Sequence, residues 1–404
     1  MKKIKKIFTS FLAGLLAFSL TAFSGCSDAL NEILSAFDKK EETTELPEDG
    51  ETESEEGNDG NESEKPEDEQ EPPAQPPTDI QTETLSIHFL ELGNKYTGDC
   101  TLIKVGDTEV LIDAGSRQGS AETIVPYIQN YCTDGVLEYV IATHAHQDHI
   151  AGFVGTKESK GVFESFVCQT IIDFPLTNAT TKIYQSYLEL RDQEVAEGAK
   201  RYSALECYRE TGDAKRSYTL AEGVRMNILY TPFYEQETSD ENDYSVCMLL
   251  SQGDDHYLFT GDLEGEGEEK LVEYNELPKC RLFKGGHHGS PTSNTEALLS
   301  VIQPEIVCVC CCCGSDEYTN NILNMFPSQA FVDRVAKYTD QIYVTTIVSE
   351  DEKGFTAMNG NIVITSDGTT VTTSFSGHSL KFKDTEWFKQ NRTWPEDGKN
   401  SSSP

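Results

Sequence analysis

The sequence predicts a layered α/β domain, and three observations lead to that fold class. Short apolar runs bounded by glycine or charged residues recur along the chain, as expected for many strands. Longer stretches with apolar residues at helical spacing lie between several of these runs. No internal repeat is visible, and 404 residues with 37% hydrophobic content are enough for one large core.

The expected elements begin at residue 85. Three successive strands are predicted at 85–93, 100–106 and 108–115, the last of which ends in an Asp-Ala-Gly turn at Asp113. The predicted helices are 120–132 and a stretch around 180–199. Further strands are expected at 136–146, 223–231, 244–252, 256–262, 280–286, 305–311, 341–346, 360–368 and 369–377.

The N-terminus has the features of an export signal. Lysines precede an apolar stretch from Ile7 to Phe23, and small residues then lead to Cys26. The ending FSGC resembles the lipobox of bacterial lipoproteins, although Phe23 stands where leucine is usual. This resemblance implies that Cys26 is the lipid anchor. Ordinary signal cleavage and an uncut membrane span are the alternatives.

The segment after the signal is strongly acidic. Residues 41–72 contain one base, Lys65, among many carboxylates, and the proline-rich PPAQPP follows. Such a segment cannot bury enough apolar surface to fold, which predicts an extended tether; an acidic ligand-binding tail is the alternative. The whole chain has 32 Lys and Arg against 69 Asp and Glu, a net charge of −37. This charge repels polyanions and disfavours tight nonspecific binding of DNA.

These features divide the chain into four parts. We expect a lipoprotein signal peptide at 1–25, a lipid-anchored acidic disordered linker at 26–82, a folded domain at 83–378 and a C-terminal tail at 379–404. The tail is expected to be mostly loose, with Trp387 and Trp394 docking on the domain or on a partner. The predicted location is the cell surface, as an exported lipoprotein anchored to the outer face of the membrane.

Cysteine is unusually frequent for an exported chain. The twelve cysteines include the run CVCCCC at 308–313. This run has the character of a buried strand in which cysteine serves as a small hydrophobe, and a redox or metal role is the alternative. Because neighbouring strand residues point to opposite faces, Cys310 to Cys313 cannot all reach one ion.

The densest chemical signal is THAHQDH at 143–149. A strand that ends in His144-Ala145-His146 and turns through Asp148 and His149 places nitrogen and oxygen ligands around one point, which suits a divalent metal ion. Two adjacent ions need further ligands, including a bridging carboxylate. Downstream turns offer Asp262 in FTGD and two histidines in GGHHGS.

The order LIDAG, THAHQDHIAG, LFTGD and HHGS, closing with strands such as GNIVITSDG, resembles the metallo-β-lactamase superfamily. Within it the chain is most similar to the hydrolase domain of ComEC-type DNA-uptake competence proteins, which also occurs as a free-standing secreted homologue. The resemblance covers about residues 85–376. It implies an αββα sandwich of two mixed sheets flanked by helices, and a hydrolase domain at 83–378.

The resemblance also implies a site with two divalent metal ions, zinc as the first choice and manganese as the second. The ligands that it implies are His144 and His146 for the first ion, Asp148, His149 and His288 for the second, and Asp262 as the bridge. His287 would then lie beside the leaving group. We therefore expect Asp148 and His287 to take part in catalysis.

Other residues are expected around this site. Asp113 matches the structural aspartate of the family, which supports the histidine-rich loop through hydrogen bonds. Many members carry one more histidine between the first cluster and the bridging aspartate, whereas this chain offers only His256, at the far end of a strand, roughly 20 Å away. NDYS resembles the group's substitute, so Asn242 or Asp243 is expected at the open side of the site. Asp99 in TGDC either edges the site or is a plain turn residue.

The resulting functional hypothesis is an extracellular, membrane-tethered, metal-dependent hydrolase. Its expected substrates are phosphodiesters, with DNA as one candidate that the acidic charge disfavours. A second hypothesis keeps the metal ions and changes the substrate to a cell-wall phosphorylcholine ester, a lactone or another ester. A third is a non-catalytic surface binding module. The oligomeric state is not indicated by the sequence.

Overall fold

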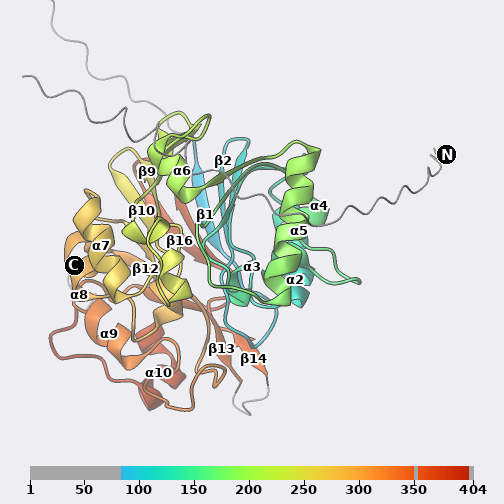
Figure 1. The fold of residues 1–404 in the computed structure, drawn as a ribbon. Helices are drawn as coiled ribbons and strands as arrows, with labels where there is room; N and C mark the ends of the chain where they lie inside the picture. Colours follow the sequence, from blue (N-terminus) through green and yellow to red (C-terminus); the bar gives the residue numbers. More distant parts are fainter. Residues whose placement is uncertain (1–82, 350–353, 400–404) are drawn as a thin grey trace, which may run out of the picture. The chain divides into compact units, whose positions relative to one another are not determined.

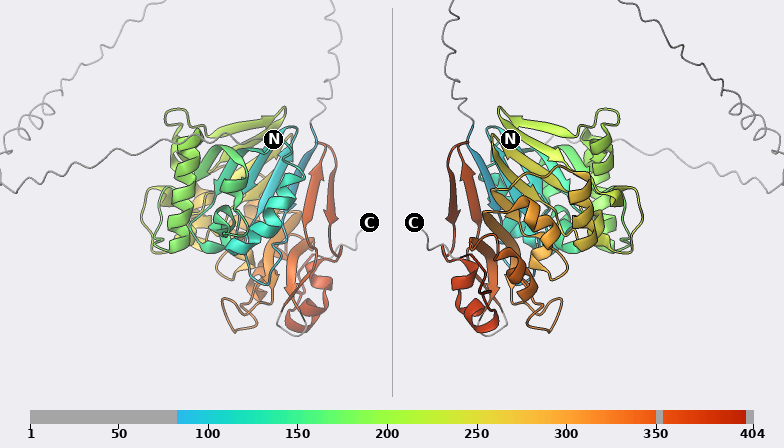
Figure 2. Two further views of the ribbon diagram at one scale, coloured as in Figure 1. Left: turned by 90° about the vertical axis from the view of Figure 1, so that its right-hand side faces the viewer. Right: turned by 90° about the vertical axis from the view of Figure 1, so that its left-hand side faces the viewer.

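The computed structural model describes residues 83–349 and 354–399, which form two mixed β-sheets of eight strands each with helices on the outer sides (Figures 1 and 2). This is the αββα sandwich that the sequence predicts. The signal peptide, Cys26 and the acidic linker lie outside the described residues. None of the helices in the described ranges has the length and apolar character needed to cross a membrane.

The first sheet combines antiparallel and parallel pairs. β1 pairs antiparallel with β2 and β15, whereas β3, β4, β5 and β6 are parallel to one another. Its strands, in spatial order, are β16 (Val371–Phe375), β15 (Ile362–Ser366), β1 (Leu85–Phe89), β2 (Thr101–Val105), β3 (Thr108–Ile112), β4 (Val136–Ala142), β5 (Val167–Asp173) and β6 (Lys200–Ser203).

The second sheet has the same mixed character. β10 to β13 are parallel, and β7 to β9 extend the sheet through antiparallel pairs. Its strands, in spatial order, are β14 (Phe355–Ala357), β13 (Ile342–Val348), β12 (Ile306–Cys313), β11 (Leu282–Lys284), β10 (Asp255–Phe259), β9 (Met248–Gln252), β8 (Val224–Ile228) and β7 (Ser217–Ala221).

The helices form two outer layers (Figure 1). Beside the first sheet lie α2 (Ala121–Gln129), α3 (Gln147–Val154), α4 (Val162–Ser165) and α5 (Lys182–Glu197). Beside the second lie α7 (Gly265–Tyr274), α8 (Glu296–Ile302), α9 (Gln329–Val335) and α10 (Glu386–Asn391). Shorter elements are α6 (Ala204–Arg209), η1 (Gln118–Ser120), η2 (Pro232–Tyr234), η3 (Glu241–Tyr244), η4 (Gly286–Gly289) and η5 (Phe382–Asp384).

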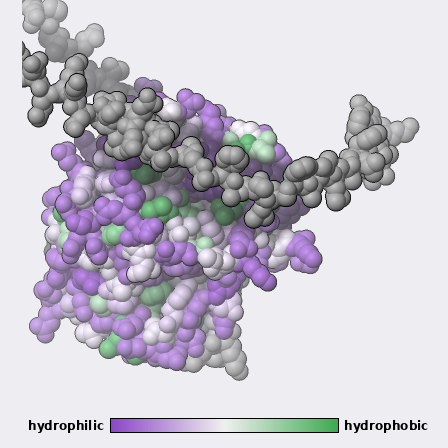
Figure 3. Space-filling model, in the orientation of Figure 1, coloured by the Kyte–Doolittle hydropathy of each residue, from purple (hydrophilic) through white to green (hydrophobic). Residues whose placement is uncertain are grey.

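The cysteine-rich strand β12 is fully buried, as its sequence predicts. Cys308 and Cys310 lie in the core that includes the space between the sheets, and Cys311 and Cys313 lie in the core under α8, α9 and α10. The alternation therefore separates the thiols onto two faces. All eleven cysteines in the described ranges are free thiols. The apolar side chains are mostly inside, and the face shown in Figure 3 is largely hydrophilic.

The C-terminal residues that the structure describes pack on the domain. Phe382 and Phe388 are buried in the core under the second sheet, and Trp387 and Trp394 pack against that core. Arg392 is also buried, and its guanidinium donates hydrogen bonds to the carbonyls of Met325 (2.8 Å) and Pro327 (3.0 Å). This C-terminal stretch thus fixes part of the loop that precedes α9.

Candidate metal centre

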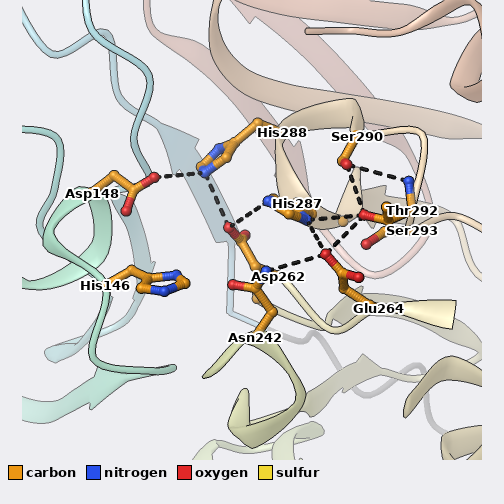
Figure 4. Close-up of polar contacts among 12 residues, drawn as sticks. His146, Asp148, Asn242, Asp262, Glu264, His287, His288, Ser290, Thr292 and Ser293 are labelled. Carbon is orange, nitrogen blue, oxygen red and sulfur yellow. Dashed lines mark hydrogen bonds and ion pairs between the residues drawn. The ribbon is translucent and has the colours of Figure 1, made fainter. Parts of the chain in front are cut away.

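Loops next to strands of both sheets bring four buried ligand groups together. These are Asp99, His149, Asp262 and His288, and one ligand atom of each lies within 4.8 Å of the others. Figure 4 shows Asp262 and His288 of this group. Asp99 precedes β2, His149 is on α3 after β4, Asp262 follows β10, and His288 follows β11. Imidazole and carboxylate groups in this number and spacing suit a borderline divalent ion such as zinc.

His149 is held between two carboxylates. Its Nδ1 lies 2.7 Å from Oδ2 of Asp113, and its Nε2 lies 3.0 Å from Oδ2 of Asp262. Asp113 also accepts hydrogen bonds from the backbone N–H and the hydroxyl of Thr143, both at 2.8 Å. A metal-binding histidine usually donates a hydrogen bond from one ring nitrogen to a carboxylate and binds the ion with the other. Here Nδ1 faces Asp113, and Nε2 is directed at the centre.

His288 has the same type of arrangement. Its Nδ1–H donates to the backbone carbonyl of Cys310 at 2.8 Å, and this bond directs Nε2 toward the centre. Nε2 lies 3.2 Å from Oδ2 of Asp262 and 3.5 Å from Oδ2 of Asp148. Oδ2 of Asp262 therefore lies beside both imidazole nitrogens that the resemblance assigns to the second ion.

Close backbone contacts position these loops. The carbonyl of Asp148 accepts a hydrogen bond from the N–H of Asp99 at 3.0 Å, and that of His149 accepts from the N–H of Ala114 at 2.7 Å. A Cβ on Gly115 would lie 1.5 Å from the Asp148 carbonyl oxygen, so only glycine fits there. Because Gly115 has no side chain, the start of α3 packs directly against the Asp-Ala-Gly turn.

The turn that carries the paired histidines has an unusual backbone. His287 (φ 47°) and His288 (φ 53°) are both in the left-handed region, which is costly for residues with a side chain. The side-chain amide of Asn294 offsets part of this cost because it bonds both the N–H and the carbonyl of Gly286 at 2.8 Å. Strain of this kind is typical of functional sites.

The first two histidines of the motif lie at the edge of the centre. His144 is fully buried, with its ring 4.1 Å from that of His149 between centroids, whereas His146 is exposed at the start of α3. Nε2 of His144 lies 3.0 Å from Nδ1 of His146, so the two rings bond to each other. Figure 4 shows the His146 ring directed toward the side of Asp262. Neither belongs to the group of four.

Lys284 belongs to the centre although no motif in the sequence indicates it. Lys284, the last residue of β11, is buried, and its ammonium forms an ion pair with Asp99 and lies 3.8 Å from Oδ1 of Asp262. Burial lowers the pKa of Lys284 most, but the charges of Asp99 and Asp262 more than offset this and hold it above its usual value. Asp99 therefore edges the centre, paired with a buried cation.

The electrostatics favour a bound cation. Burial raises the pKa of Asp262, but the neighbouring His149 and His288 hold it well below its usual value. Of the buried acids Asp99, Asp113, Asp148 and Asp262, the ammonium of Lys284 contacts Asp99 and Asp262. Oδ1 of Asp262 and Nε2 of His288 are buried without a hydrogen-bond partner. Such atoms are costly to bury, and a divalent ion would satisfy both the charge and the vacant lone pairs.

His287 lies on the open side of Asp262. Its Nε2 is 3.9 Å from Oδ2 of Asp262, and its Nδ1 is 3.2 Å from Oε1 of Glu264. Glu264 also accepts hydrogen bonds from the hydroxyl of Thr292 (2.8 Å) and from the side chain of Asn242 (3.2 Å), as Figure 4 shows. Asn242 thus reaches the centre through Glu264 and His287.

Asp243 and His256 do not belong to the group of four. Asp243 is buried, with Oδ2 3.5 Å from the hydroxyl of Thr238. His256, near the start of β10, bonds Ser251 through Nδ1 at 2.9 Å. Asp148 remains near the centre but carries a further contact, since the hydroxyl of Tyr318 donates to its Oδ2 at 2.6 Å. No pattern in the sequence indicated Tyr318.

Comparisons with known proteins agree with this arrangement. Residues 93–184 and 236–313 match the family model of the Metallo-beta-lactamase superfamily. These two ranges include all four residues of the group and also His144, His146 and Asp148.

The curated relatives are longer proteins. The chain is 28% identical over 277 residues to Recombination protein 2 of Haemophilus influenzae, a match that covers 67% of the chain and 29% of that protein. It is 25% identical over 239 residues to Competence protein ComA of Neisseria gonorrhoeae, covering 59% of the chain and 28% of that protein. The chain therefore spans less than a third of the length of these relatives.

Among solved structures, the chain is similar to the metallo-beta-lactamase fold protein YhfI of Bacillus subtilis. The two are 11% identical with a TM-score of 0.36, and the match covers 66% of the chain and 96% of that structure.

Proposed function

Because the chain carries a metallo-β-lactamase superfamily domain, we propose that it is a metal-dependent hydrolase that cleaves phosphodiesters. The observation that carries the proposal is the convergence of His149, His288 and Asp262 with their Nε2 and Oδ2 atoms directed at one point. A divalent ion held there would lower the pKa of a water molecule and supply a hydroxide nucleophile. Zinc fits the donor set best, with manganese second.

The protein groups have distinct tasks in this proposal. Asp262 would orient the attacking water with the oxygen that already faces both imidazoles. Asp148 and the pair His144 and His146 would extend the ligand set on the side of α3. His287, which Glu264 orients through Nδ1, would donate a proton to the leaving oxygen from Nε2, which lies 3.9 Å from Oδ2 of Asp262. No covalent intermediate on the chain is required.

The substrate is part of the proposal. The names of two relatives refer to recombination and competence, which supports DNA as one candidate. The net charge of −37 disfavours a polyanion as the substrate. It favours a smaller ester, such as a cell-wall phosphorylcholine ester or a lactone. We further propose that residues 1–25 direct export, that Cys26 carries a lipid, and that residues 26–82 tether the hydrolase domain to the outer face of the membrane.

Hydrolysis of bis-p-nitrophenyl phosphate by the zinc-loaded chain tests the proposal. We compare the wild type with Asp262→Asn and, as a matched control, with Asp192→Asn on the exposed side of α5. The proposal expects turnover by the wild type and the control, and a loss of at least 100-fold in Asp262→Asn. Bound metal without turnover on a broad panel of phosphodiesters, esters and lactones would instead favour a binding module.

A second assay separates the substrates. DNA degradation and choline release are measured with the same enzyme across a series of salt concentrations. A nuclease is expected to weaken steeply as salt increases, because binding to the phosphate backbone releases counterions. Choline release that is unaffected by salt, without DNA degradation, would identify the wall ester as the substrate.

A further inference from the structure

The loop of residues 314–328 borders the centre and lies beyond residue 313, where the family match ends. Both of its ends are anchored: the N–H of Gly314 bonds the carbonyl of Phe326 at 2.9 Å, and the N–H of Ser328 bonds that of Gly289 at 2.8 Å. A Cβ on Gly289 would lie 2.7 Å from Pro327, so the loop packs tightly against the turn that carries the histidines.

Side chains from other segments hold the middle of this loop. Glu317 forms an ion pair with Arg117 and accepts a hydrogen bond from the N–H of Thr97 at 2.9 Å. On the other side, Arg392 bonds the carbonyls of Met325 and Pro327. The 314–328 loop is thus a fixed wall of the site.

Tyr318 connects this wall to the centre. Its ring packs on Phe326 with centroids 5.4 Å apart, and Phe326 in turn contacts the rings of His287 (5.7 Å) and His288 (5.9 Å). The residue is 51% exposed, yet its hydroxyl reaches Oδ2 of Asp148 at 2.6 Å. The hydroxyl therefore stands at the boundary between solvent and the buried acids.

The position of Asp148 shows from which side Tyr318 approaches. Asp148 is 9% exposed, whereas Asp99, Asp113 and Asp262 are 1–2% exposed. Tyr318 therefore contacts the one acid of the centre that borders solvent. A group that only supported the ligand would be expected behind it, as Asp113 is behind His149.

An anionic substrate that reaches the centre from the solvent side needs hydrogen-bond donors beside Asp148. The buried acids around the centre only accept hydrogen bonds when ionised, and the ammonium of Lys284 is already paired with Asp99. Of the partly exposed groups that contact the centre, the hydroxyl of Tyr318 and the ring of His287 can donate.

We propose that Tyr318 is a substrate-contacting residue whose O–H donates a hydrogen bond to a non-bridging oxygen of the substrate's phosphoryl group. This inference rests on the proposed function and assigns the 314–328 loop to substrate recognition. The hydroxyl exchanges its contact with Oδ2 of Asp148 for the substrate oxygen, while Phe326 keeps the ring in place. No bond other than hydrogen bonds forms or breaks.

The test compares the zinc-loaded wild-type chain with Tyr318→Phe, which removes only the hydroxyl. Tyr274→Phe, a change at another exposed tyrosine, which ends α7 and packs on Tyr230, is the matched control. Three quantities are measured for each: zinc content, kcat and KM for bis-p-nitrophenyl phosphate, and the Kd of diethyl phosphate, an anionic diester that is bound without rapid cleavage. The last measurement does not depend on turnover.

We expect Tyr318→Phe to retain its zinc, to lose about 10- to 100-fold in kcat/KM and to bind diethyl phosphate about tenfold more weakly, since one hydrogen bond to a charged group is removed. Unchanged turnover and Kd would overturn the inference. Loss of zinc in proportion to activity would also overturn it, because Tyr318 would then act only through Asp148. If the wild type shows no turnover, the proposed function fails, and the diethyl phosphate Kd still decides the role of Tyr318.

Discussion

The Nε2 atom of His149 lies 3.0 Å from Oδ2 of Asp262, although 113 positions separate the two residues in the chain. His149 belongs to α3, which follows a strand of the first sheet, and Asp262 follows β10 of the second. The contact therefore exists only when both sheets are assembled. Any ion that binds these two side chains stabilises the sandwich as a whole.

This relationship predicts that zinc raises the free energy of unfolding. At a free zinc concentration about 100 times the Kd, the gain is expected to be about 2.7 kcal/mol, provided that the unfolded chain binds zinc weakly. Urea unfolding with zinc and with a chelator measures it. Asp262→Asn is expected to lose this gain, and an equal gain in that variant would place the stabilising ion elsewhere.

Asp113 is expected to control metal affinity without touching the ion. Asp113→Asn keeps the shape of the side chain but replaces one acceptor oxygen of a group that bonds Thr143 and His149. We expect the Kd for zinc to rise about 10- to 100-fold, as for other changes behind a ligating histidine. Competition with a chromogenic chelator gives the Kd. Asp134→Asn, in the turn before β4, is the control, and equal Kd values for all three proteins would contradict the prediction.

Lys284 is expected to stabilise the metal-free protein by compensating Asp99. Lys284→Met leaves a buried carboxylate without its cation, which typically costs about 3–5 kcal/mol. The double variant Lys284→Met with Asp99→Asn removes both charges and should recover most of the loss. Urea unfolding in the presence of a chelator measures both. If the double variant is no more stable than the single one, the ion pair is not the cause.

His88 supplies a pH dependence that is independent of the metal centre. The residue is buried, its two ring nitrogens bond Ser86 and Tyr127 at 2.8 Å, and burial lowers its pKa to about 4. The unfolded chain protonates this histidine near pH 6.5 and the folded chain only near pH 4. The contribution of His88 to stability is therefore complete above pH 6.5 and is lost as pH falls toward 4.

We expect the wild type to lose about 2–3 kcal/mol more than His88→Gln between pH 7 and pH 4.5. Chemical unfolding at the two pH values measures this difference. His378→Gln, at an exposed position, serves as the control and should follow the wild type. If wild type and His88→Gln lose the same free energy, the buried neutral histidine is not the cause.

Arg392 is expected to maintain the loop beside the centre. Arg392→Met leaves the carbonyls of Met325 and Pro327 without their donor, which should lower the free energy of unfolding by on the order of 2–4 kcal/mol. Lys389→Met, on the exposed side of α10, is the matched control and should change stability by less than about 1 kcal/mol. Equal stability of Arg392→Met and the control would show that the C-terminal stretch does not support the loop.

Much of the fold follows from local patterns in the sequence. Short apolar runs predicted most of the strands, but not β5, β6, β7 or β14. The fully buried β12 with its free thiols agrees with the interpretation of cysteine as a small hydrophobe. The sequence also predicted which segments meet at the centre. The histidine-rich motif follows β4, Asp262 follows β10, and His288 follows β11, so each lies shortly after the end of a strand.

Other parts of the centre were not accessible to that reasoning. Lys284 and Tyr318 are single residues without a motif, and only the three-dimensional contacts with Asp99 and Asp148 reveal them. For the same reason, the sequence did not decide whether Asp99 edges the site or is a plain turn residue. The resemblance also implied that His144 and His146 hold the first metal ion. In the structure the two rings bond each other, so their role toward a first ion stays a prediction.

The most direct test of the central claim is the zinc content of the folded chain after saturation and dialysis, measured by elemental analysis. The account predicts at least one zinc ion per wild-type chain and loss of that ion in both Asp262→Asn and His288→Ala, with circular dichroism unchanged. A wild type that retains no divalent metal ion, or variants that retain as much as the wild type, would contradict it.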